Sequence, residues 1–277
     1  MATYVVAVSG GVDSIVLLHM LTQTSDHKII VAHFDHGIRD DSAEDASFVG
    51  SLATEYGFTF ESTREELGPH ASEETARNRR YTFLRLVAKK YEGRIVTAHH
   101  GDDAIETIAI NLHRGTGWRG LAVLDSDIVR PLLLHSKAKL IEYAQQRNLI
   151  WHEDSTNATT VYLRNRLRRL TQDLQPGVKR ELLALRSQQV ESKRLIEQAV
   201  VELVGLGPHY SRYFFTHIPS VVAIECLRYV TDARLTRPQL ERALLAIKTA
   251  GVKHAYQAGS GITFNFSTRN FSLSLLK

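Results

Sequence analysis

The stretch SGGVDS, which runs from Ser9 to Ser14, decides the fold of this chain. It follows a run of β-branched residues at Tyr4–Val8 and opens an apolar helical pattern at Ile15–Leu21. Backbone N–H groups of a glycine-rich turn between a strand and a helix can converge on an anion. The stretch therefore predicts a phosphate site made by six residues: Ser9, Gly10, Gly11, Val12, Asp13 and Ser14.

This phosphate loop is not a Walker A loop, because it lacks the lysine that such a loop requires. Asp13 is an unusual residue here, since a carboxylate beside bound phosphates is repelled unless a cation lies between them. Asp13 therefore indicates Mg²⁺. The alternative interpretation is a helix cap after a glycine turn, with no ligand.

Strand and helix patterns alternate through the first two thirds of the chain. The expected strands are Tyr4–Val8, Ile29–Phe34, Phe58–Ser62, Arg94–Ala98 and Asp127–Leu132. Helices are expected from Ser42 to Tyr56, where Gly57 follows as a C-terminal cap, and after Ser136. This order predicts a doubly wound, mainly parallel five-stranded α/β sheet of the Rossmann-like kind.

The pattern changes after Trp151 to a polar loop and then to a basic helical segment at Tyr162–Leu170. A long helix is expected from about Val178 to Val204, because Pro and Gly residues bound it on both sides. The tail shows two helical patterns and a terminal hairpin at Ile262–Leu275. We predict a nucleotide-binding catalytic domain at 1–175, a linking helix at 176–207, and a small, mostly helical α+β domain at 208–277.

The amino-acid composition limits which cellular compartment and which cysteine chemistry we expect. The 277 residues are 43% hydrophobic and 23% charged, and no apolar run approaches the ~20 residues that span a bilayer. No targeting segment precedes Tyr4, so we expect a cytoplasmic protein without a membrane role. Cys226 is the only cysteine, which excludes an internal disulfide and a C-x-x-C pair. The net charge of +4 fits a polyanionic partner.

Six further segments carry a family resemblance. They are HFDHGIR at 33–39, EETARNRRY at 73–81, TAHHGDDAIET at 97–107, RGTGWRGL at 114–121, WHEDSTN at 151–157 and YLRNRLR at 162–168. With the phosphate loop, and in this order, they resemble the tRNA(Ile)-lysidine synthetase family of PP-loop enzymes, the N-type ATP pyrophosphatases. Two positions depart from the family pattern, because Asp35 replaces an Asn and Thr156 replaces a Ser.

The resemblance implies a two-step ligase reaction that forms a C–N bond. ATP would adenylate O2 of the first anticodon cytidine of an isoleucine tRNA with a CAU anticodon, and pyrophosphate would leave. The ε-amino group of free L-lysine would then displace AMP. The implied cofactors are ATP and Mg²⁺, and the implied partners are this tRNA and lysine. The tail is a candidate for tRNA contact, and the oligomeric state stays open, a homodimer being one option.

The resemblance also implies roles for individual residues. The catalytic candidates are Asp13, Arg77, His99, Asp103 and Glu106. The ATP contacts beyond the loop are His36, Arg80, Arg114 and Gly115, and the metal ligands are Asp13 and Asp102. The tRNA contacts are Arg164, Asn165, Arg166 and Arg168. The i, i+3 spacing of Asp103 and Glu106 leaves open whether they bind lysine or a second Mg²⁺.

Three rival functions stay open. A PP-loop enzyme for tRNA thiolation would normally need cysteines, which argues against it here. An amidating synthetase for small molecules would not need the basic segment Tyr162–Arg168. A nucleotide-binding module without catalysis is opposed by the acidic residues Asp13, Asp102, Asp103 and Glu106, which are costly to keep near phosphate.

Overall fold

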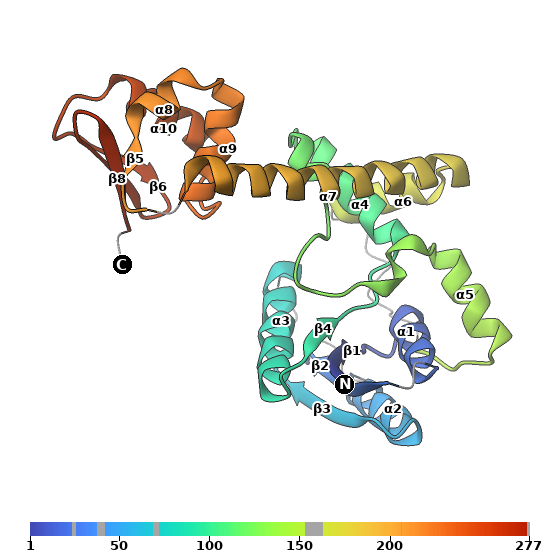
Figure 1. Ribbon diagram of the computed structural model, residues 1–277. Coiled ribbons are helices and arrows are strands. Elements are labelled where there is room, and N and C mark those ends of the chain that lie inside the picture. Colours follow the sequence, from blue (N-terminus) through green and yellow to red (C-terminus); the bar gives the residue numbers. More distant parts are fainter. Residues whose placement is uncertain (24–25, 38–41, 69–71, 153–162, 206, 276–277) are drawn as a thin grey trace. The chain divides into compact units, whose positions relative to one another are not determined.

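The computed structural model describes residues 1–23, 26–37, 42–68, 72–152, 163–205 and 207–275 (Figure 1). The chain divides into two compact units, Met1–Val190 and Glu191–Lys277. The long helix α7 (Pro176–Val204) is the helix expected at 176–207, and it contributes residues to both units. Within the described residues, no helix has both the length and the apolar character that crossing a bilayer requires.

The first unit is built on a parallel sheet. Its strands are β1 (Ala2–Ala7), β2 (His27–Asp35), β3 (Thr59–Arg64) and β4 (Arg94–Val96), in the spatial order β3-β2-β1-β4. Val5 of β1 lies opposite Ile30 of β2 and Ile95 of β4. The two central strands are the most apolar because helices cover both faces of the sheet.

Successive residues of β1 face the two helical layers. Val6 belongs to a core with residues of α1 (Val12–Thr22), α2 (Ser42–Glu55) and α5 (Lys137–Gln146). Val5 belongs to a separate core with Leu84 of α3 (Glu73–Lys90). In Figure 1, α3 accordingly lies on one side of the sheet, with α1 and α2 on the other. The expected doubly wound α/β architecture is confirmed.

The prediction of a fifth strand is wrong. In place of a strand at Asp127–Leu132 there is one isolated parallel bridge, between Val96 and Val129. Val129 donates to the carbonyl of Ile95 at 2.9 Å and accepts from Thr97 at 3.0 Å, and the pairing then stops. Pro131 has no N–H to extend the ladder, and it opens the short 3-10 helix η2 (Pro131–Leu134) instead.

The expected helix boundaries near the sheet are confirmed. Helix α2 ends at Glu55, and Gly57 follows with a φ of +71°, donating its N–H to Thr54. Ser136 caps α5 by accepting from the N–H of Lys139. The remaining elements of this unit are α4 (Gly101–His113), the 3-10 helix η1 (Trp118–Leu121) and α6 (Leu163–Gln172).

The second unit is an α+β domain. Its elements are β5 (Tyr210–Ser211), α8 (Arg212–His217), α9 (Ser220–Val230), α10 (Arg237–Thr249), β6 (Ala255–Gly259), β7 (Ile262–Phe266) and β8 (Asn270–Leu275). The expected hairpin is β7 paired antiparallel with β8, in a sheet of order β5-β8-β7-β6. Phe264 and Phe271 of the hairpin are fully buried with Phe215, so this unit has its own core.

The turn from β1 into α1 generates a stability prediction. Gly10 has a φ of +92°, and a Cβ there would lie 3.8 Å from its nearest neighbours, so Gly10→Ala adds backbone strain without a clash. We expect it to lower the free energy of unfolding by about 1–2 kcal/mol. Gly11→Ala is the control, because Gly11 has a φ of −73° and room for a methyl group. Urea denaturation without nucleotide checks this, and equal losses in both variants would contradict it.

Candidate functional site

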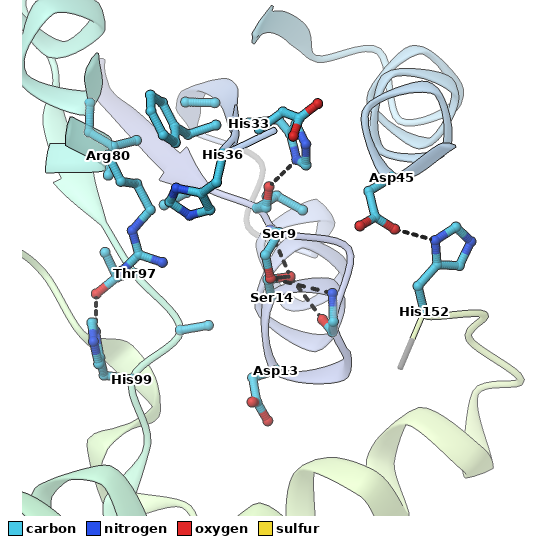
Figure 2. Close-up of a pocket in the computed structure, with 18 of the residues that line it drawn as sticks. Ser9, Asp13, Ser14, His33, His36, Asp45, Arg80, Thr97, His99 and His152 are labelled. Carbon is cyan, nitrogen blue, oxygen red and sulfur yellow. Dashed lines mark hydrogen bonds and ion pairs between the residues drawn. The ribbon is translucent and has the colours of Figure 1, made fainter. Parts of the chain in front are cut away.

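A pocket of about 390 Å³ lies where the parallel strands of the first unit end. Its walls come from the phosphate loop, the end of β2, α3 and the residues that follow β4. Figure 2 shows Ser9, Asp13 and Ser14 at the start of α1, with Arg80, Thr97 and His99 on the β4 side. Open α/β sheets bind ligands at this edge, so the pocket is the candidate site.

The phosphate loop presents the uncapped N-terminus of α1. Its cap residue, Gly11, is extended and supplies no side-chain hydrogen bond to the first turn. Ser14 Oγ donates to the Gly11 carbonyl at 2.8 Å and accepts from the Ser9 N–H at 3.2 Å, which fixes the loop. The first N–H groups of an uncapped helix are natural donors to an anion. The loop geometry therefore fits the phosphate site expected from the sequence.

One hydrogen bond from outside the loop holds it in place, and further contacts fix the residue that donates it. The N–H of His152 donates to the Gly10 carbonyl at 3.0 Å, and the His152 ring lies 2.6 Å from an Asp45 carboxylate oxygen. The same ring stacks on Phe48 at 4.4 Å between centroids. The segment beginning at Trp151 is one of those that carry the family resemblance, but sequence reasoning assigned His152 no role. Its contact with the loop joins residues more than a hundred positions apart.

Asp13 and Asp102 are tied to two lysines that sequence reasoning missed. Lys137 Nζ lies 2.7 Å from both carboxylate oxygens of Asp13. The backbone N–H of Lys137 donates to Asp102 Oδ2 at 2.7 Å, and Lys179 Nζ donates to Oδ1 at 2.7 Å. Burial opposes ionisation of Asp102, but the bonds from Lys179 and Lys137 outweigh it, so the pKa of Asp102 lies below its usual value. Nothing in the sequence pattern marks either lysine.

These contacts change the expected metal ligands. Asp102 does not line the pocket, and both of its oxygens accept hydrogen bonds, so it does not fit the metal role expected for it. Asp103 does line the pocket, and its Oδ2 accepts from the His100 N–H at 2.9 Å. Mg²⁺ beside phosphates needs only one or two carboxylates, so Asp13 and Asp103 fit it. No cluster of three or more His, Cys, Asp or Glu that could hold a metal occurs in the described ranges.

The β4 side of the pocket is cationic. Burial and the nearby guanidinium groups of Arg130, Arg80 and Arg77 lower the pKa of His99 to about 3, so its ring is neutral at pH 7. Thr97 Oγ1 lies 2.7 Å from His99 Nδ1. The Nε atoms of Arg80 and Arg130 are buried and have no hydrogen-bond partner among the described residues. Arg77 and Arg80 were expected here, whereas nothing in the sequence marked Arg130.

Glu106 lies apart from the pocket. Its carboxylate is 3% exposed, and Arg168 Nε of α6 lies 2.9 Å from Oε2. The structure therefore joins a residue expected to bind a ligand cation with one expected to bind tRNA. Arg166 of the same helix is exposed. The side chains of Arg164 and Asn165 and the segments 38–41 and 153–162 lie outside the described residues.

The remaining ATP contacts divide into two cases. His36 lines the pocket at the end of β2, as expected. Arg114 and Gly115 do not line it, because they follow the far end of α4, roughly 20 Å from the start of that helix at ~1.5 Å per residue. Gly115 has a φ of +69° and ends the helix, which accounts for a glycine at this position without a ligand. Asp35, which stands where the family pattern has an Asn, accepts a hydrogen bond from the Gly37 N–H and forms an ion pair with Arg64 at 3.2 Å.

Comparison with known proteins gives a consistent assignment. Residues 2–174 match the family described as PP-loop domain. The tRNA(Ile)-lysidine synthase of Exiguobacterium sibiricum is 42% identical over 62% of this chain and 44% of its own length. That of Thermus thermophilus is 34% identical over 87% of this chain and 51% of its own length. The one from Thermotoga maritima is 30% identical over 90% and 65%.

A solved structure shares the fold. The U34-tRNA thiolase of Methanococcus maripaludis, described with its [4Fe-4S] cluster, superposes with a TM-score of 0.58 at 18% identity. The match covers 69% of this chain and 73% of that one. At this identity the likeness concerns the fold alone.

The depressed pKa of His99 generates a pH prediction. Between about pH 6.5 and 3 the unfolded chain binds a proton at this ring that the folded chain does not. The free energy of unfolding therefore falls as pH drops through this window, and His99→Asn should make that fall shallower. His113→Asn, at the exposed end of α4, is the control. Urea denaturation at pH 7 and pH 4.5 measures the difference, and equal slopes in the two variants would refute it.

Proposed function

The chain belongs to the PP-loop domain family, and we propose that within this family it is a tRNA(Ile)-lysidine synthetase. It spans between 44% and 65% of the length of the three curated relatives described above. The observation that carries the proposal is a single pocket in which the uncapped phosphate loop faces Arg80 and neutral His99. Such a pocket suits a triphosphate that is cleaved at its α-phosphate, because backbone N–H donors lie on one side of it and the Arg80 guanidinium group lies on the other.

The first step would be adenylation of the anticodon cytidine. The N–H groups at the start of α1 would hold phosphate oxygens, and Arg80 would stabilise the charge that develops as pyrophosphate leaves. Mg²⁺ would be held by Asp13, because one carboxylate suffices beside phosphates, and it would neutralise the departing pyrophosphate. Arg77 and Arg130 add positive charge around His99.

His99 would act as a hydrogen-bonding group and not as a base. A pKa of about 3 makes its ring too weak to deprotonate the ammonium group of lysine, whose usual pKa is ~10.4. When the hydroxyl of Thr97 donates to Nδ1, the ring carries its proton on Nε2. That N–H would then donate to a phosphate oxygen without adding a cation.

The second step would be attack by lysine. We propose that Asp103, which lines the pocket, binds the ammonium group of the lysine substrate that does not react, and that Glu106, which lies outside the lining, assists through its charge. The carboxylate of Glu106 is buried beside Arg168, whose hydrogen bond fixes its orientation. A second Mg²⁺ suits Glu106 less well, because the guanidinium group of Arg168 repels a divalent cation about twice as strongly as a monovalent ammonium group at the same distance.

The second unit would contact the tRNA. It contains eleven Lys and Arg against six Asp and Glu, whereas residues 1–190 contain 23 against 24. A groove of about 540 Å³ on this unit is lined by Arg212, Lys248 and Arg269, and none of the acidic residues that the structure describes lines it. Arg212 donates to the carbonyls of Ile247, Ala250 and Ser267, so its charge is already used within the unit. Exposed Lys248 and Arg269 therefore suit phosphate contacts better.

Two rival enzyme activities are weaker. Thiolation with a cluster or a persulfide would need more than one accessible cysteine, and Cys226 is single and fully buried in the second unit. Burial raises the pKa of the Cys226 thiol to about 11, which leaves little thiolate at pH 7. An amidating synthetase would release pyrophosphate without tRNA. The tRNA dependence of pyrophosphate release separates that activity from the one proposed.

The proposed reaction has a direct test. We expect a transcript of isoleucine tRNA with a CAU anticodon to gain one lysine residue on the anticodon cytidine when incubated with the protein, ATP, Mg²⁺ and lysine. Mass spectrometry of nuclease fragments measures the adduct, and a transcript with uridine in place of that cytidine is the control. Pyrophosphate release without tRNA, and no adduct, would contradict the proposal.

Glu106→Gln tests the lysine assignment. The variant keeps the shape of the side chain and removes its charge, so we expect tRNA-dependent pyrophosphate release to persist while the Michaelis constant for lysine rises at least about tenfold. Adenylated tRNA should accumulate. Glu181→Gln, an exposed change on α7, is the control. Loss of pyrophosphate release that added Mg²⁺ restores would instead favour a metal role.

Lys248→Ala with Arg269→Ala tests the contact between the second unit and tRNA. The logarithm of the tRNA affinity falls linearly with the logarithm of the salt concentration, and each lost phosphate contact should make this fall shallower by about 0.7–0.9. The slope of the double variant should therefore be smaller in magnitude by about 1.5. Arg237→Ala is the control, because Glu241 already neutralises that guanidinium at 3.0 Å. Filter binding across a range of salt concentrations measures the slopes. If the double variant matched the control, the tRNA contact would lie elsewhere.

A further inference from the structure

The side chains that line the pocket carry more negative than positive charge, which disfavours an anionic nucleotide. Four carboxylates line it, from Asp13, Asp35, Asp45 and Asp103, whereas Arg80 is the one Lys or Arg of the described residues that does so. A triphosphate would be repelled by this wall unless other groups neutralise it. Each carboxylate does have a nearby partner, and the four partners differ in how firmly they are held.

Three of the partners are fixed by further contacts. Arg64, beside Asp35, also binds Glu66 at 2.6 Å. His152, beside Asp45, stacks on Phe48 and donates its N–H to the phosphate loop. Asp103 accepts from a backbone N–H at the start of α4, which cannot leave without unwinding that helix. These three pairs are therefore part of the framework of the pocket.

Lys137 is different, because only its backbone is fixed. Its N–H is bound to Asp102, so the start of its side chain is held at the first residue of α5. The side chain is 40% exposed, and the ammonium group is held by Asp13 alone among the described residues. A lysine ammonium on a flexible four-carbon stem can change partners at small cost. It can therefore leave Asp13 without disturbing the fold.

We propose that Lys137 is a phosphate-binding residue of the nucleotide site, whose ammonium group neutralises Asp13 until a nucleotide binds and then moves to its phosphates. This inference rests on the proposed use of ATP. Asp13 lies in the first turn of the helix whose N-terminus would hold those phosphates, so the ammonium group starts beside its second partner. When it leaves, Asp13 becomes available to the divalent cation that accompanies the nucleotide. Every charge keeps a partner before and after the exchange.

The exchange predicts opposite effects on two ligands. Without the ammonium group, ATP in the presence of EDTA loses a charged hydrogen bond, so Lys137→Met should weaken its binding by about ten- to a hundredfold. Mn²⁺ without nucleotide no longer competes with the ammonium group for Asp13, so the same variant should bind Mn²⁺ more tightly, by roughly tenfold. A lysine with a purely structural role would not produce this opposed pair of changes.

The experiment compares full-length wild type, Lys137→Met and Lys139→Met by calorimetry with ATP and by electron paramagnetic resonance with Mn²⁺. Lys139 is exposed on the same turn of α5, so it matches the substitution without touching Asp13. Lys139→Met should change neither affinity. If Lys137→Met is poorly folded, as judged by its melting curve, Lys137→Arg replaces it. The arginine keeps the charge and should hold ATP within about threefold of wild type while Mn²⁺ binding stays weak.

The outcomes separate this inference from the proposed function. One outcome is that wild type binds ATP while Lys137→Met and Lys139→Met have equal affinities for ATP and for Mn²⁺. That result would overturn the role of Lys137 and leave the proposed function standing. Weaker Mn²⁺ binding in Lys137→Met would do the same, because it would show that the lysine supports the metal site. With Lys137→Arg, an ATP affinity more than tenfold below wild type would also count against it. A wild-type protein that binds no ATP would overturn both proposals.

Discussion

The left-handed backbone of Gly10 is the constraint on which the rest of the site depends. Its φ of +92° turns the chain sharply from the central strand β1 into α1, so that the first turn of the helix opens at the sheet edge. Only glycine adopts this conformation without strain. The hydrogen bond from His152 to the Gly10 carbonyl then ties the later part of the first unit to this one residue.

Charge balance is the second organising feature of the first unit. The carboxylates of the pocket are costly beside an anionic ligand, and each has a cation or an N–H group close by. Asp102 does not line the pocket, and its carboxylate accepts hydrogen bonds from Lys137 of α5 and Lys179 of α7. It therefore joins the starts of two helices to α4. The acidic residues serve the framework as much as the ligand.

Local patterns predicted most elements of both units. The alternation of apolar runs with amphipathic stretches predicted β1 to β4, and the central strands β1 and β2 are the most apolar because helices cover both of their faces. The sequence also predicted the helix caps at Gly57 and Ser136 and the terminal hairpin. Helix capping and hairpin pairing depend on residues only a few positions apart, so local sequence is enough to predict them. The strand expected at Asp127–Leu132 failed because Pro131 limits pairing to one bridge, which an apolar run does not reveal.

By itself, the sequence determined the phosphate loop, the doubly wound sheet and the resemblance that names a reaction, because these depend on residue types at short, fixed spacings. Only the tertiary structure decided which side chains meet. It brought Lys137 to Asp13, Arg130 to His99 and Arg168 to Glu106, and it left Arg114 away from the pocket. The physical reason is that partners of buried charges are chosen by packing between distant segments, and spacing along the chain does not encode that choice.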